Sequence, residues 1–166
     1  MTHSLFLVRH AIAAEPGDAW PDDAKRPLTH KGVARMREVV AGLESLGVTL
    51  DLVLTSPLLR ARHTADLLLD GLRPEPALAV TAALAPGARP IQVAEELGRH
   101  AKRERIALVG HEPALGELAA WLTGAKTPFS FKKGGVCRID VAALPPTQTG
   151  QLIWLATPRM LRALSR

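Results

Sequence analysis

Short apolar segments recur along this chain between segments with helical spacing, and this alternation restricts the fold more than any other feature. Ser4–Val8, Asp51–Thr55 and Ile106–Val109 have the length and composition of strands. The last of them contains no polar residue, as is typical of a parallel strand that is covered on both faces. The other predicted strands are Ala77–Thr81, Val136–Val141 and Leu152–Ala156.

Predicted helices separate these strands. Thr29 is a suitable N-cap for a helix that runs to about Leu46, and Gly47 is a suitable stop. One face of this helix carries Val33, Met36, Val40 and Leu43 at helical spacing. The other predicted helices run from Pro57 to about Leu72, over Ile91–Lys102, and from Pro113 through Trp121. This order predicts an α/β fold with three layers, α/β/α, around a mostly parallel sheet. The length of 166 residues suits one domain, residues 1–166.

The charge of the chain favours anionic ligands. Lys and Arg total 21 against 16 Asp and Glu, which gives a formal net charge of +5. The densest basic run, Arg99–Arg105, is predicted to end the helix over 91–102, where cations complement the helix C-terminus. No aromatic or recognition-helix pattern accompanies this run, so we expect no nucleic-acid binding.

The sequence predicts a cytoplasmic protein. Its one cysteine, Cys137, allows no internal disulfide and lies in a strand-like apolar segment, where we expect a small core residue. The N-terminus has no basic region followed by a long apolar stretch, so no signal peptide is expected. Uncharged apolar runs stay below the ~20 residues that span a bilayer, so no membrane association is expected.

Charged and imidazole side chains follow three of the predicted strands. Arg9 and His10 end the first strand, Arg60 opens the helix after the second, and His111 follows the fourth. Ligands of open α/β sheets bind beyond the carboxyl ends of the strands. Guanidinium groups are planar, permanently charged donors for phosphate, and a neutral imidazole can attack phosphorus. These residues therefore predict a site for phosphoryl transfer.

A metal site is the main rival for two histidines. Neither His10 nor His111 has carboxylate or thiolate ligands at familiar spacings, and Arg9 would oppose a cation. The chain also lacks the glycine-rich loop that cradles nucleotide phosphates. We therefore expect no metal and no cofactor.

Four segments, each weak alone, together resemble the histidine phosphatase superfamily of phosphoglycerate mutase-like proteins. They are Val8–Ala11, Arg26–Gly32, Ser56–Ala61 with Thr64-Ala65, and Val109–Pro113, and they span nearly the whole chain. The pattern is most similar to the small phosphohistidine phosphatases of the SixA type. The resemblance implies that His10 is the phosphorylated nucleophile. It also implies that Arg9, Arg60 and His111 bind the phosphoryl group, and that Arg26 reaches the same pocket.

One position departs from the family pattern. Ala11 stands where the family usually has glycine. Alanine tolerates a positive φ less well than glycine, so a left-handed conformation at this position would be strained.

The source of a proton for the leaving group is open. Larger family members carry an acid on an insertion. The chain between Arg60 and His111 has no room for such a helical lid, and residues 82–90 contain no Asp or Glu. Glu112 is one candidate acid, although it can equally interact with backbone amides at the start of its helix. The other candidates lie in one loop: Asp18, Asp22 and Asp23.

The lack of a certain acid favours a good leaving group. Imidazole has a free pKa near ~6.5 and needs less acid assistance than an alcohol. We therefore expect hydrolysis of phosphohistidine on a signalling protein. One alternative is a phosphomonoesterase that acts on a small phosphorylated metabolite. Another is a regulatory module that binds phosphate without catalysis. A mutase is disfavoured because it needs a closed site.

Overall fold

A six-stranded sheet runs through the centre of the protein, in a computed structural model that describes residues 1–165. The strands are β1 (His3–Arg9), β2 (Leu52–Thr55), β3 (Ala77–Val80), β4 (Arg105–Gly110), β5 (Val136–Val141) and β6 (Gln151–Ala156). Their order in the sheet is β3-β2-β4-β1-β5-β6. The first four are mutually parallel, and β5 and β6 run antiparallel at one side. The sheet is therefore mostly parallel, as predicted.

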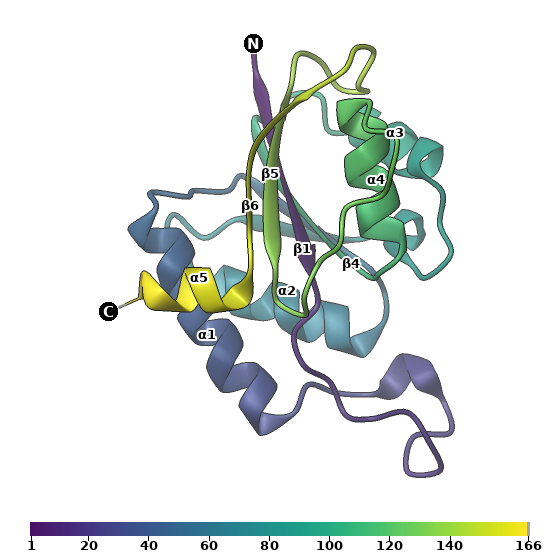
Figure 1. The fold of residues 1–166 in the computed structure, drawn as a ribbon, viewed down its shortest axis with the longest axis vertical. Helices are drawn as coiled ribbons and strands as arrows, with labels where there is room; N and C mark the ends of the chain where they lie inside the picture. The colour runs from purple at the N-terminus through teal and green to yellow at the C-terminus, as the bar shows by residue number, and fades with distance from the viewer. Residues whose placement is uncertain (166) are drawn as a thin grey trace.

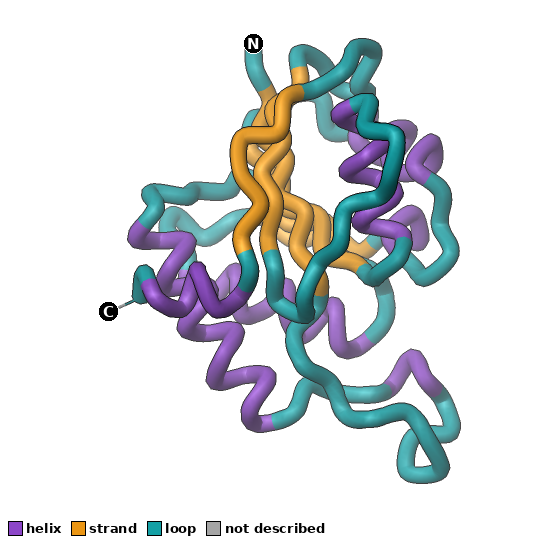
Figure 2. Tube along the Cα trace, in the orientation of Figure 1, coloured by secondary structure: helices purple, strands orange, loops and turns teal. Residues whose placement is uncertain are grey.

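Helices cover both faces of this sheet (Figures 1 and 2). One face packs against α1 (His30–Ser45), α2 (Leu59–Gly71) and α5 (Pro158–Ala163), and the other against α3 (Pro90–Gly98) and α4 (Ala114–Thr123). Two short 3-10 helices lie in connections: η1 (Asp23–Lys25) and η2 (Ala82–Leu84). These layers confirm the predicted α/β/α arrangement.

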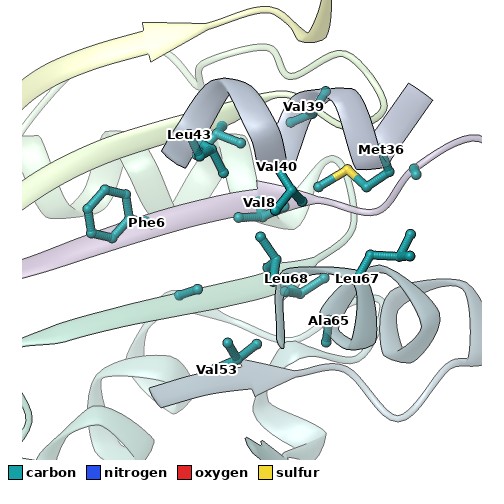
Figure 3. Close-up of a cluster of buried hydrophobic side chains, with 14 of the residues drawn as sticks. Phe6, Val8, Met36, Val39, Val40, Leu43, Val53, Ala65, Leu67 and Leu68 are labelled. Carbon is teal, nitrogen blue, oxygen red and sulfur yellow. The ribbon is translucent and has the colours of Figure 1, made fainter. Parts of the chain in front are cut away.

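The central strand β1 supplies side chains to both halves of the core. Phe6 and Val8 join the cluster under α1 and α2, which Figure 3 shows with Met36 and Leu68 among its members. Leu5 and Leu7 point to the opposite face, in the cluster under α3 and α4. A strand that alternates between two buried faces shows no polar periodicity, which explains its apolar sequence. Cys137 is fully buried on β5, as expected of a core residue.

The predicted end of the helix over 91–102 was wrong. The helix, α3, ends at Gly98. The basic run Arg99–Arg105 therefore forms no helical end, because residues 99–104 make the turn before β4 and Arg105 is the first residue of that strand. The His100 amide donates to the Leu97 carbonyl and the Arg103 amide to the His100 carbonyl. These tight turns bring the chain back to the sheet, where Asp51 accepts the amide of Arg105 at 2.9 Å. Residues 99–102, which were predicted to continue the helix, therefore form part of the turn that leads back to the sheet.

One helix was absent from the sequence prediction. Helix α5 begins after Thr157, whose hydroxyl accepts the amide of Met160 at 3.2 Å, with Pro158 in its first turn. Its Leu161 is buried against α1. A threonine N-cap followed by proline is a helix-start signal that the sequence carried.

The connection from β3 to α3 contains only residues 81–89 with η2. As predicted, no helical lid is inserted there. Within residues 1–165, no helix is both long enough and apolar enough to cross a membrane.

Candidate active site

A cavity of about 290 Å³ opens at the carboxyl end of the parallel strands. Arg9 is the last residue of β1, Arg60 lies in the first turn of α2, and His111 follows β4. These three and His10 all line the cavity, so the structure brings the four predicted residues together. The remaining lining residues are Ala13, Glu15, Pro16, Arg26, Pro86, Glu112 and Lys133.

The backbone around His10 is held on three sides. The His10 amide donates to the Gly110 carbonyl at 3.1 Å, which ties it to the end of β4. The Gly134 amide donates to the carbonyls of Arg9 and His10, both at 3.1 Å. The Ala11 amide donates to Thr64 Oγ1 at 3.0 Å on α2. This network fixes the position of the histidine before any ligand binds.

Ala11 adopts its place without the strain considered from the sequence. Within residues 1–165, no residue other than glycine has a positive φ. The alanine methyl group is buried, and the residue belongs to the core cluster under α1 and α2. An ordinary backbone conformation explains why alanine is accepted at this position.

His10 carries a free ring nitrogen. Its Nδ1 lies 2.8 Å from the Ala11 carbonyl oxygen, and a carbonyl can only accept, so Nδ1 donates a proton and Nε2 keeps its lone pair. Burial, together with the nearby charges of Arg60, Arg9 and Lys133, lowers the pKa of His10 to about 4, although the hydrogen bond to the Ala11 carbonyl acts in the opposite direction. At neutral pH the ring is therefore uncharged and nucleophilic.

Two arginines of the cavity, Arg60 (buried) and Arg9 (partly buried), are each anchored at one end of the guanidinium group. Arg9 Nη1 donates to the Phe131 carbonyl at 2.7 Å. Arg60 donates from Nη1 to the Asp23 carbonyl at 3.0 Å and from Nη2 to Asp23 Oδ2 at 3.1 Å. Burial lowers the pKa of both groups from the ordinary value for arginine, which still leaves them charged at neutral pH.

His111 lies close to His10, with ring centroids 5.2 Å apart. Its Nε2 is 2.8 Å from Ser56 Oγ, which also accepts the Leu58 amide at 3.2 Å. Burial lowers the pKa of His111 to about 3, and the charges of Arg60 and Arg9 contribute to this shift. Like His10, this ring is neutral at pH 7.

Three of these side chains carry buried polar atoms without hydrogen-bond partners. The atoms are Arg9 Nε, Arg60 Nε and His111 Nδ1. Buried polar groups are nearly always paired in folded proteins, and each unpaired donor costs roughly 1–3 kcal/mol. Three such atoms on residues around one cavity can receive a tetrahedral oxyanion.

Asp23 links Arg60 to Arg26. Its Oδ1 accepts from Arg26 Nε at 2.8 Å, while Oδ2 faces Arg60. Arg26 also donates to the Ala14 carbonyl at 2.6 Å and lines the cavity, where the sequence predicted it to reach. The hydrogen bond from Arg26 holds the pKa of the Asp23 carboxyl below its usual value. Asp23 is thus an ionised bridge between guanidinium groups, which is a poor state for a proton donor at neutral pH.

Glu112 is committed to the backbone. Its Oε1 accepts the Gly116 amide at 2.7 Å, and its Oε2 accepts the Phe131 amide at 3.1 Å. Of the two roles considered for this residue, the geometry favours the contact with backbone amides. The carboxylate joins the start of α4 to the segment that holds Arg9.

Sequence reasoning missed two charged residues of the cavity. Glu15 is an exposed carboxylate in the loop after β1, and Lys133 is an exposed cation in the segment before β5. Neither has a hydrogen-bond or ion-pair partner within residues 1–165. Lys133 reaches the cavity because β5 pairs with β1, a long-range contact that leaves no local sequence signal.

Asp18 and Asp22, the other loop acids considered from the sequence, are absent from the described lining of the cavity. Asp22 instead caps η1, where its side chain accepts the Ala24 amide at 3.0 Å. Over residues 1–165, no group of three or more His, Cys, Asp or Glu side chains is arranged to hold a metal ion.

A family profile, a related sequence and a solved structure all relate this chain to histidine phosphatases. Residues 5–85 match the sequence profile of the Histidine phosphatase superfamily (branch 1). An uncharacterized protein of Picosynechococcus sp. is 37% identical over 164 residues, which cover 95% of this chain and 98% of that protein. Phosphohistidine phosphatase SixA of Escherichia coli is 28% identical over 161 residues, covering 95% and 96% of the two chains. A solved structure of the protein histidine phosphatase SixA complexed with tungstate is 26% identical, with a TM-score of 0.84 over 94% of this chain and 97% of that one.

Proposed function

Because this chain belongs to the histidine phosphatase superfamily, we propose that it is a phosphatase that forms a phosphohistidine intermediate on His10 and hydrolyses phosphohistidine in a protein. Arg9, Arg60 and His111 bind the phosphoryl group in this proposal, and Arg26 adds charge at the edge of the cavity. In this proposal, groups of this chain and a water molecule carry out the whole reaction.

The unpaired donors around His10 carry this proposal. Arg9 Nε, Arg60 Nε and His111 Nδ1 are buried without partners on the walls of one cavity. They match the equatorial oxygens of a transferring phosphoryl group, which needs preorganised donors in a desolvated site. Ser56 already accepts the Leu58 amide, so its hydroxyl hydrogen is available to His111 Nε2. The proton of His111 then lies on Nδ1, as the proposal requires.

The reaction has two steps. His10 Nε2 attacks phosphorus with its lone pair, and the P–N bond to the substrate imidazole breaks. A substrate ring that carries a proton on its other nitrogen leaves as neutral imidazole. Nδ1 of His10 keeps its proton and donates a hydrogen bond to the Ala11 carbonyl, which stabilises the positive ring of the intermediate. Water then attacks phosphorus, the bond between His10 Nε2 and phosphorus breaks, and the phosphoryl group leaves as dihydrogen phosphate. The lone pair returns to Nε2, and His10 is again neutral.

The surroundings of the cavity favour a protein substrate. The connection 81–89 contains no helical lid, so a histidine on the surface of another protein has access to the cavity. Glu112 is held by two amides and Asp23 by two arginines, so both are ill placed to protonate an alkoxide. An imidazole leaving group has less need of such an acid.

One observation favours a small phosphomonoester as a second candidate substrate. Glu15 lines the cavity with an unpaired carboxylate and can reach a leaving alcohol. If Glu15 supplies a proton to esters, Glu15→Gln lowers ester turnover and leaves phosphohistidine turnover unchanged.

A substrate panel tests the proposal. Wild type and His10→Ala are assayed against a phosphohistidine-containing protein and several phosphate esters, and the enzyme is quenched during turnover to trap phosphate on the protein. We expect loss of turnover by at least about a thousandfold in His10→Ala, and a trapped phosphoryl group only in wild type.

His63→Ala is the matched control, because His63 lies on α2 outside the cavity. Turnover of esters alone would replace the proposed substrate with a small phosphorylated metabolite. Phosphate binding without turnover or a trapped intermediate would indicate a regulatory module instead.

A further inference from the structure

A second, smaller pocket lies beside the candidate active site. It has a volume of about 40 Å³ and is lined by α1, α5 and the segment before β5. Helices α1 and α5 pack against each other at this side of the sheet (Figure 1). The lining includes Ala11 and Ile12, which directly follow His10, and Lys133 lines both pockets. A molecule that enters the active-site cavity therefore passes close to this pocket.

The small pocket has an excess of positive charge. Arg35 comes from α1, Lys133 from the segment before β5, and Arg162 from α5. Within residues 1–165, the side chains of Arg35 and Lys133 make no hydrogen bond or ion pair, and Arg162 Nε is buried without a partner. Arg162 forms an ion pair with Glu38, whose Oε2 lies 3.8 Å from Arg162 Nη1 and whose side chain is 56% exposed. One exposed carboxylate at that distance compensates little of this charge.

The other side chains that line the small pocket are apolar, and they limit which anions fit into it. Met36 and Val39 are buried core residues, and Ile12 and Pro158 complete the apolar part. A volume of about 40 Å³ corresponds to a few water molecules, since one water needs roughly 10–15 Å³. Apolar walls with cations around them suit a carboxylate on a short methylene stem better than a free, strongly hydrated phosphate.

We propose that this pocket, with Arg35, Lys133 and Arg162, binds an Asp or Glu side chain of the phosphoprotein whose phosphohistidine enters the active site. This inference rests on the proposed function. The shared Lys133 places the two binding events next to each other on one surface. Docking of an acidic segment then selects phosphohistidines that have acidic neighbours and leaves the chemistry at His10 unchanged.

The test uses two synthetic phosphohistidine peptides. One carries Asp and Glu on both sides of the phosphohistidine, and the other carries Asn and Gln at the same positions. Hydrolysis of both peptides and of free phosphohistidine is measured for wild type, Arg35→Glu and Arg162→Gln. Arg37→Glu is the matched control, because Arg37 is an exposed arginine of the same helix that is not part of this pocket.

We expect wild type to prefer the acidic peptide through a lower KM. Arg35→Glu should reduce kcat/KM for the acidic peptide by about fivefold to tenfold, with a smaller reduction in Arg162→Gln. Turnover of free phosphohistidine and of the neutral peptide should stay at the wild-type level, which also shows that the variants are folded.

Equal kcat/KM of wild type for the two peptides would overturn the inference. An equal loss in Arg37→Glu and Arg35→Glu would also overturn it, because the effect would then come from net charge. Both results leave the proposed function standing. Failure of wild type to cleave any phosphohistidine substrate, with no phosphate trapped on His10, would instead overturn the proposed function and this inference together.

Discussion

The two ends of the parallel strands differ in whether their polar groups have hydrogen-bond partners. At the amino end, Asp51 accepts the amides of Glu104 and Arg105 at 3.0 and 2.9 Å and the Arg105 guanidinium at 2.7 Å. At the carboxyl end, Arg9, Arg60 and His111 keep buried nitrogen atoms without partners. Strands β2 and β4 lead from the residues at the amino end to Arg60 and His111, and β1, which pairs with β4, carries Arg9. Paired charges at one end stabilise the fold, and buried nitrogen atoms without partners at the other end are available to a ligand.

This difference predicts a division between stability and turnover. Unpaired buried donors lower the stability of the free protein, and an oxyanion that binds them restores it. Changes at the carboxyl end should therefore affect turnover first, whereas changes at the amino end should affect the free energy of unfolding first. The following changes are ordered by the size of the effect that we expect.

Arg60→Ala removes a donor that the proposed transition state requires. We expect kcat/KM to fall by about 100–1000-fold, as for the loss of one preorganised donor to developing charge, which corresponds to about 2.7–4 kcal/mol of transition-state stabilisation. The free energy of unfolding should change by a smaller amount than this. Steady-state kinetics and urea denaturation measure the two quantities. Arg62→Ala is the control, because Arg62 lies on the same helix and pairs with Asp66 at the surface. Equal kinetics of the two variants would contradict the assignment of Arg60.

Asp51→Ala breaks the paired network at the opposite end. Two amides and a guanidinium lose their acceptor, so we expect the free energy of unfolding to fall by about 2 kcal/mol, with kcat/KM unchanged. Asp70→Ala is the comparison, because Asp70 is exposed on α2. A loss of turnover without a loss of stability in Asp51→Ala would remove the distinction between the two ends.

We expect the free energy of unfolding to fall at acid pH because of His10 and His111, the two histidines at the carboxyl end of the strands. The folded-state pKa of His10 is about 4 and that of His111 about 3, below the value of ~6.5 for an unfolded histidine. The unfolded chain therefore binds protons first as the pH falls, and the stabilisation present above pH ~6.5 is lost progressively down to about pH 4 for His10 and about pH 3 for His111. The free energy of unfolding should fall by about 1.4 kcal/mol per pH unit for each histidine.

Urea denaturation between pH 7 and pH 5 measures this effect in wild type and in His10→Gln. The variant should lose less stability over the interval because one of the two histidines is gone. Identical pH dependence in the two proteins would show that His10 is not held neutral by burial.

Glu112→Gln gives the smallest expected effect. Glu112 lines the active-site cavity at the carboxyl end, but both of its oxygen atoms have hydrogen-bond partners, like those of Asp51 at the amino end. Glutamine has one acceptor oxygen for the amides of Gly116 and Phe131, so the free energy of unfolding should fall by about 1 kcal/mol. Turnover of phosphate esters should equal that of wild type. A selective loss of ester turnover at unchanged stability would restore Glu112 as a proton donor.

Local signals predicted most of the fold. The apolar strands and the Thr29 cap of α1 followed from residue types alone, because burial on both faces and capping are local requirements. The end of α3 depended on the return to β4 and on Asp51, a contact distant in sequence. The strand order could not be predicted from these signals, since it depends on which strands pair across the whole chain.

For the site, the sequence indicated the four residues that motifs mark, and the structure places them in one cavity. It did not indicate Lys133, which lines the same cavity only because β5 pairs with β1. Nor did it predict the bridge from Asp23 to Arg26 and Arg60, because an acid in a loop has no fixed partner until the loop is placed.

The position of β1 has a consequence for how the protein is made. This strand is the first in the sequence, yet it lies between β4 and β5, and its last residues are tied to Gly110, Gly134 and Gly135. During synthesis, the segment that carries His10 leaves the ribosome long before its neighbours exist. Such non-local pairing slows folding and exposes unpaired strand edges. The nascent chain should therefore acquire its active site only after β5 has emerged, so that chains released before residue 136 stay inactive and depend on chaperones.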